Sequence, residues 1–92
     1  MHINALQRHL TSMYGEPIHL EGQTAYRWEI TSIGPMPVYL CLTIEESTRR
    51  AAIWIFDPNK QFDQTFFVKV HDENDLNEAI ETIRLHLPTR AY

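Results

Sequence analysis

Four stretches between Tyr26 and Val70 alternate apolar and polar residues with a period of two, and an amphipathic helical pattern lies on either side of them. A period of two is typical of strands that bury one face, whereas spacings of three and four are typical of helices. Short connections between strands favour antiparallel neighbours, because a parallel crossover needs a dozen or more residues. This order predicts an α+β domain: an antiparallel meander sheet of four to five strands, with an N-terminal and a C-terminal helix packed on one face, in two layers.

Two helices are predicted, over about residues 2–14 and about residues 73–87. Acidic residues crowd the start of the second helix and Pro88 ends it, which suits the helix dipole and the missing proline N–H. Each helix has an apolar stripe that can cover the sheet. The stripes are Ile3, Leu6, Leu10 and Met13 in the first helix and Leu76, Ala79, Ile80, Ile83 and Leu87 in the second.

The strands are predicted over about residues 18–20, 24–32, 38–45, 51–56 and 65–71. In the second of these, Trp28 and Ile30 point to one side while Arg27 and Thr31 point to the other. Prolines at positions 35 and 37 are expected to break the strand pattern, because neither can donate a ladder hydrogen bond. The stretch 51–56 is apolar on both faces, which indicates a central strand.

A chain of 92 residues is long enough for a single domain, residues 1–92, and too short for two. Its net charge is −4 and its eight Lys and Arg residues are scattered, which argues against a surface for duplex nucleic acid. No basic-then-apolar leader opens the sequence, and no apolar run approaches the roughly 20 residues that span a bilayer. These features predict a cytoplasmic protein that does not associate with membranes.

The face of the predicted sheet that is turned away from the helices is unusual. Such a face is expected to be mostly polar when it is solvated. Alternation instead places aromatic side chains from neighbouring strands on it, with charged side chains at the rim, which is the anatomy of a protein interface. The candidate interface or ligand residues are Tyr39, Trp54, Phe56, Phe67, Arg27 and Lys69.

A structural interpretation of the same residues is that the protein covers its own patch. The loop of residues 59–64, which includes Phe62, or the carboxy-terminal tail with Tyr92, folds back over the rings in that case. A bulge that flips one strand and sends Trp54 into the core is a further alternative. The sequence leaves these alternatives open.

Patterns for catalysis or metal binding are not found in the sequence. The five histidines form no pair at helical spacing, and a zinc site needs three or four converging ligands. Cys41 lies between Leu40 and Leu42 in mid-strand, which favours a small buried or interfacial hydrophobe over a nucleophile. The three glycines are isolated, which disfavours a phosphate-binding loop. We therefore expect no catalytic residue, no metal and no cofactor.

The sequence favours a non-catalytic module that binds a protein partner or forms a homodimer through the aromatic face. The alternative is a small-molecule-binding protein or enzyme, in which the 59–64 loop roofs an apolar pocket on that face. Single-stranded nucleic acid can also stack on aromatic residues beside basic ones, but the net acidity disfavours this partner. No motif identifies the partner or the ligand.

Overall fold

The computed structural model describes residues 2–20, 25–45, 47–48, 50–69 and 73–87, with the side chains of residues 2–4 and 73 excluded. Its elements are α1 (His2–Tyr14), β1 (Ile18–His19), β2 (Ala25–Ile33), β3 (Met36–Glu45), β4 (Arg50–Phe56), β5 (Asp63–Lys69) and α2 (Glu73–His86). This is the order of a helix, a run of strands and a second helix that the sequence predicts.

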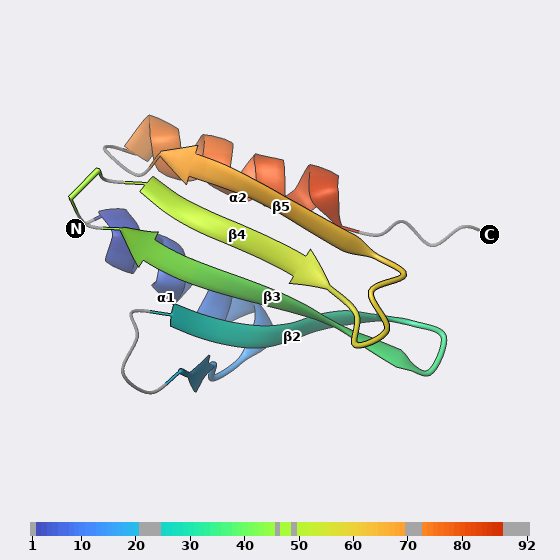
Figure 1. The fold of residues 1–92 in the computed structure, drawn as a ribbon. Coiled ribbons are helices and arrows are strands. Elements are labelled where there is room, and N and C mark those ends of the chain that lie inside the picture. Colours follow the sequence, from blue (N-terminus) through green and yellow to red (C-terminus); the bar gives the residue numbers. More distant parts are fainter. Residues whose placement is uncertain (1, 21–24, 46, 49, 70–72, 88–92) are drawn as a thin grey trace.

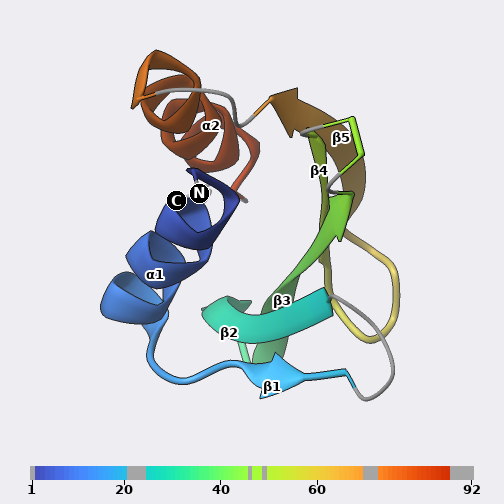
Figure 2. The ribbon, with the colours of Figure 1, turned by 90° about the vertical axis from the view of Figure 1, so that its left-hand side faces the viewer.

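Five strands form one antiparallel sheet in the order β1-β2-β3-β4-β5, so each strand lies beside its neighbour in the sequence (Figure 1). On one face of the sheet, α1 packs against β2 and α2 packs against β5, and the two helices contact each other. Figure 2 shows the helices on one side of a strongly twisted sheet, with neither helix on the opposite face. The predicted α+β meander is confirmed.

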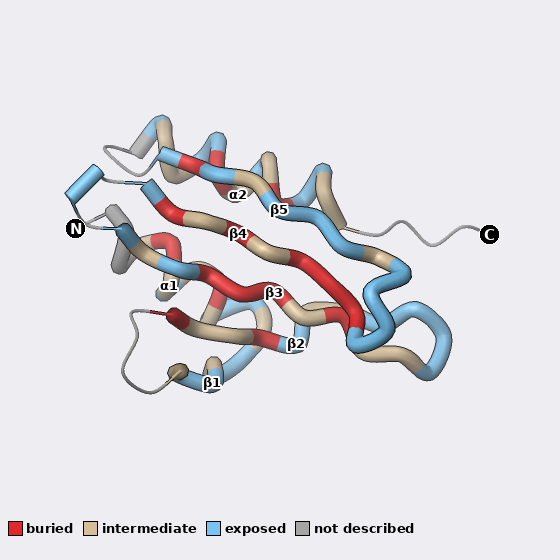
Figure 3. Tube along the Cα trace, in the orientation of Figure 1, coloured by how far each residue is buried: buried red, intermediate tan, exposed pale blue. Residues whose placement is uncertain are grey.

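The core lies between the helices and the inner face of the sheet. Trp28 is its largest side chain and is only 2% exposed. β3 and β4 form its centre, and Figure 3 shows buried residues along both strands. Each buried Leu or Ile contributes about 1.5–3 kcal/mol relative to an exposed one. The buried cluster is Leu6, Leu10, Trp28, Val38, Leu40, Leu42, Ala51, Ile53, Ile55, Val68, Ala79 and Ile83.

The β2–β3 hairpin differs from the expectation that Pro37 lies outside a strand. β3 begins at Met36 and includes Pro37. Gly34 has a φ of 59°, which suits the first central position of a two-residue hairpin turn. β4 ends opposite Tyr39, so Pro37 lies past the β3–β4 ladder, where a missing N–H removes no hydrogen bond.

A bulge interrupts the pairing of β2 with β3. Glu29 pairs with Tyr39, and the next pair joins Thr31 to Val38, so Ile30 is the extra residue. Thr31 therefore lies opposite a core residue, and the prediction that it points away from the core is wrong.

The remaining element bounds shift by a few residues from those predicted. β5 begins at Asp63 rather than at residue 65, and β4 begins one residue early, at Arg50. β1 and α2 each end one residue earlier than predicted, whereas residues 70 and 71 fall outside the described part of the chain.

Candidate functional site

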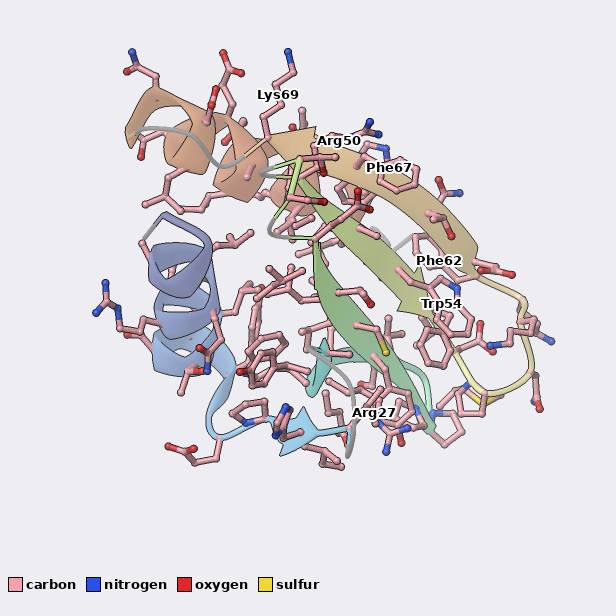
Figure 4. All side chains as sticks on the ribbon, turned by 60° about the vertical axis from the view of Figure 1, so that its left-hand side comes forward. Arg27, Arg50, Trp54, Phe62, Phe67 and Lys69 are labelled. Carbon is pink, nitrogen blue, oxygen red and sulfur yellow. The ribbon has the colours of Figure 1, made fainter. Side chains whose placement is uncertain are left out.

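We call the side of the sheet without helices the outer face. Residues that pair directly across antiparallel strands point to the same side, so the register groups them in rows. One row contains Arg27, Cys41, Trp54 and Thr65, and the next contains Glu29, Tyr39, Phe56 and Asp63. Two further rows contain Thr43, Ala52 and Phe67, and Glu45, Arg50 and Lys69. All six candidate residues therefore share this face, as Figure 4 shows for Arg27, Trp54 and Phe67.

The centre of the outer face is a stack of two rings covered by a cation. The ring centroids of Trp54 and Phe56 are 3.9 Å apart, and their planes meet at 21°. Lys60 Nζ lies 4.0 Å from the Trp54 centroid and 3.9 Å from the Phe56 centroid. An ammonium group over an exposed ring contributes about 0.5–1 kcal/mol. Phe56 is only 8% exposed as a result, although no helix covers this side.

Contacts across the strands extend this stack in both directions. The ring centroids of Tyr39 and Phe56 are 5.7 Å apart, and the guanidinium carbon of Arg27 lies 5.0 Å from the Tyr39 centroid. On the other side, Trp54 Nε1 donates a hydrogen bond of 2.6 Å to Asp63 Oδ1. A continuous band of rings and cations therefore crosses the sheet from β2 to the start of β5.

Phe67 forms a second, more open part of the outer face. Its side chain is 61% exposed, and the guanidinium carbon of Arg50 lies 4.9 Å from its ring centroid. Lys69 lies opposite Arg50 in the register, which adds a second cation beside this ring. The ring thus presents apolar area to solvent next to two positive charges.

The loop between β4 and β5 explains how Lys60 reaches the rings. Asp57 is 1% exposed, and its carboxylate accepts hydrogen bonds from the backbone N–H of Asn59 at 2.8 Å and of Phe62 at 2.6 Å. Its carbonyl accepts a hydrogen bond of 3.0 Å from the N–H of Lys60. This bond closes a turn with Pro58 and Asn59 at its centre, and Lys60, with a φ of 59°, continues the chain in the left-handed conformation.

Asp57 is held in its charged form by this loop. Burial alone would raise the pKa of its carboxyl group, but backbone N–H groups of the loop, led by those of Phe62 and Asn59, outweigh burial and lower the pKa below its ordinary value. The charged carboxylate thereby stabilises the conformation of the loop.

Lys60 is not among the site residues that the sequence predicts. One of the alternatives left open by the sequence is that the loop of residues 59–64, with Phe62, folds over the patch. Phe62 instead packs against the core cluster, and the Lys60 ammonium lies on the rings. The loop thus contacts the rings through the Lys60 ammonium.

The cations of the outer face lack acidic partners within the part of the chain that the structure describes. The one ion pair found there joins Arg84 to Glu81 in α2, on the helical side. Arg27 Nε is moreover buried without a hydrogen-bond partner among the described residues. The four cations of the outer face that have no ion pair with a described residue are Arg27, Arg50, Lys60 and Lys69.

Cys41 lies between Arg27 and Trp54 in its row and is 9% exposed. Burial raises the pKa of its thiol, and the nearby charges of Arg27 and Lys60 offset part of that increase. A thiol that stays protonated is a poor nucleophile. This position agrees with the prediction of a small, buried hydrophobe.

The described residues contain no group of three or more His, Cys, Asp or Glu side chains that could hold a metal ion. Among the same residues, neither helix has the length and hydropathy needed to cross a bilayer.

A small hollow of about 90 Å³ lies between α1 and α2, on the side opposite to the outer face. It contains His9, whose Nε2 is buried without a hydrogen-bond partner among the described residues. Ligand pockets typically have volumes of about 300–1,000 Å³, so this hollow is smaller than a typical ligand pocket and has the size of a packing defect. Its lining is His9, Leu10, Met13, Tyr14, Ile80, Ile83, Arg84 and Leu87.

Comparison of the chain with protein-family models, with curated proteins and with solved structures found no match in any of the three.

Proposed function

We propose that this chain is a non-catalytic protein-binding module whose outer face binds an acidic segment of a partner protein that also carries apolar side chains. The proposal rests on one observation: four cations without ion pairs among the described residues share a sheet face with aromatic rings, and three of them lie over a ring. Rings supply apolar contact area, and unpaired cations supply charge complementarity.

Charge also distinguishes an acidic partner from a second copy on this face. Two outer faces packed against each other would oppose four cations with four cations. The acidic side chains of this face, Glu29, Glu45 and Asp63, are fewer, and Asp63 already accepts the Trp54 hydrogen bond. An acidic segment meets the cations without that repulsion.

The test uses nuclear magnetic resonance of the isotope-labelled protein with a defined probe. The probe is a synthetic peptide of alternating Glu and Leu residues, and its control is the same peptide with Lys in place of Glu. We expect the Glu peptide to shift the Trp54 indole and the Phe67 amide signals, with weaker binding at high salt because exposed charges are screened. Equal binding of the Lys peptide would overturn the proposal.

Two matched variants separate this surface from a general effect of net charge. Arg50→Glu changes a cation of the outer face, and Arg8→Glu makes the same change on the exposed side of α1. We expect Arg50→Glu to weaken peptide binding by up to about fivefold, which is the upper end for an exposed charge pair, and Arg8→Glu to have little effect. Equal effects of the two variants would contradict the proposed surface.

Two other occupants of the outer face give different outcomes in these measurements. A shift of the Trp54 indole signal with protein concentration, in the absence of peptide, would place a second copy there instead, because Trp54 lies in β4 and away from the β5 edge. A rise in melting temperature with a small metabolite but not with the peptide would favour the small-molecule alternative. Either result would replace the acidic-partner proposal.

A further inference from the structure

Within the described part of the chain, β5 is an edge strand of the sheet, because it pairs there only with β4. Five of its seven residues are exposed, whereas β1, the strand at the other edge, has only two residues. Proteins usually block long edges with prolines, central lysines or bulges. The centre of β5 has none of these devices, since it reads Thr65-Phe66-Phe67-Val68.

The outward-pointing backbone groups of β5 follow from its ladder with β4. The N–H of Asp57 donates to the carbonyl of Phe62 at 3.1 Å, in continuation of the β4–β5 register. Because consecutive residues of a strand point their backbone groups to opposite sides, those of Asp63, Thr65, Phe67 and Lys69 point away from β4. The backbone hydrogen bonds found among the described residues leave this edge unoccupied.

We infer that a second copy of this chain pairs with β5, antiparallel and about a twofold axis through Phe66. This register places Asp63 opposite Lys69 of the second copy, and the symmetry repeats the pair. Thr65 and Phe67 pair across the axis in the same way, and each exchanges backbone hydrogen bonds through its outward-pointing groups. A parallel pairing would instead place Asp63 opposite Asp63, so the charges select the twofold arrangement.

A groove beside the edge fits the incoming strand. It has a volume of about 200 Å³ and lies between the second half of β5 and α2. In the twofold register, Gln64 of the second copy lies opposite Val68, on the side of the sheet that carries α2. Its amide can donate to the exposed carboxylate of Glu78 in this groove. The groove is lined by Phe67, Val68, Lys69, Asp75, Glu78, Ala79 and Thr82.

This inference does not rest on the proposed function, because it uses the outward backbone groups of β5; only its charged pair, Asp63 and Lys69, also belongs to the outer face. The paired copies form one continuous sheet, in which the two outer faces lie side by side. Thr65→Pro therefore tests the edge without changing a cation of the outer face, and Arg50→Glu tests the outer face without changing a residue of β5.

The first test is sedimentation equilibrium of the full chain over a range of concentrations. We expect a monomer–dimer equilibrium that is micromolar or weaker, since an edge pairing is a small interface. Thr65→Pro removes an outward N–H and spares the β4 ladder, so we expect it to weaken dimerisation by about tenfold or more while stability to urea is retained. Thr65→Val keeps the N–H and is the matched control.

The second test exchanges the charges and does not depend on proline. Asp63→Lys sets two positive charges against each other in each pair, and Lys69→Asp sets two negative charges against each other. Each variant alone is therefore expected to dimerise weakly, because like charges directly opposite are destabilising. In an equimolar mixture, the heterodimer sets the two lysines of the Asp63→Lys chain opposite the two aspartates of the Lys69→Asp chain in the twofold register, so mixing the single variants is expected to restore dimerisation.

The double variant, which carries Asp63→Lys and Lys69→Asp in one chain, restores the opposite-charge pairs within a homodimer. Each pair across the axis then joins a lysine to an aspartate again, with the two charges exchanged. We expect the double variant to dimerise more tightly than either single variant, because opposite charges again face each other across the axis.

Three results would overturn the inference. They are a chain that stays monomeric at all accessible concentrations, a dimer that Thr65→Pro leaves unchanged, and a double charge variant that associates no better than the two single variants.

Discussion

Lys60 lies in the loop after β4, and its ammonium sits over the indole of Trp54 in that strand, with 4.0 Å between Nζ and the ring centroid. The same nitrogen is 3.9 Å from the centroid of Phe56. One flexible side chain thus shields two rings of a sheet face that carries no helix. The contact links the loop conformation to the exposure of the aromatic band.

Lys60→Gly is expected to uncover Trp54 with little change in stability. Loss of the ammonium removes about 0.5–1 kcal/mol of cation–π interaction, but glycine relieves the left-handed backbone at this position, where φ is 59°. Acrylamide quenching of tryptophan fluorescence measures the exposure. Trp28 is 2% exposed and serves as the internal reference, so only the Trp54 component should become easier to quench. An unchanged quenching profile would contradict the contact.

Asp57→Asn is expected to flatten the dependence of stability on acidic pH. The folded protein holds the pKa of Asp57 below its ordinary value of 3.8, so this carboxylate stabilises the fold above that pH. The stabilisation is lost as the pH falls through the folded pKa. We therefore expect the free energies of unfolding of the parent and the variant, measured in urea, to differ at about pH 6 and to converge at about pH 2. A constant difference across this range would show that the charge of Asp57 is not the cause.

Much of the fold follows from periodicity in the sequence. The alternation in β3 and β4 depends on burial of Leu40, Leu42, Ile53 and Ile55, and the same alternation assigns Trp54 to the opposite face. These are local patterns, and each strand repeats them, so the meander and the membership of the outer face are predictable.

The features that the sequence did not predict depend on single backbone conformations. The extra residue Ile30 is apolar and fits the alternating pattern, so nothing in the pattern marks the bulge. The position of Lys60 depends on a buried Asp57 that accepts several loop N–H groups, which is a tertiary arrangement. The proposed pairing at the β5 edge could not be predicted from the sequence either. Its Asp63–Lys69 pair depends on β5 beginning at Asp63, whereas the sequence pattern predicts a start at residue 65.

Gly34→Ala is expected to destabilise the protein by about 1 kcal/mol, because an L side chain is strained at a φ of 59°. The added Cβ meets no atom within 4 Å, so steric contact contributes nothing. Gly34→Asn should lose less stability than Gly34→Ala, since asparagine tolerates positive φ better than alanine. Urea unfolding measures the stabilities of the three proteins, which should decrease from the parent to Gly34→Asn to Gly34→Ala. An alanine variant as stable as the parent would contradict a strained turn.

Cys41 is expected to react slowly with a thiol reagent in the native protein. Its side chain is 9% exposed beside Trp54, and burial raises the pKa of its thiol, so little of the reactive thiolate is both present and accessible. Trp54→Ala should speed the reaction, because it removes the large neighbour across the β3–β4 pair. The rate in concentrated urea supplies the reference for a fully exposed thiol. A native rate equal to that reference would mean that the outer face opens freely, and a Trp54→Ala rate equal to the parent rate would mean that the indole does not cover Cys41.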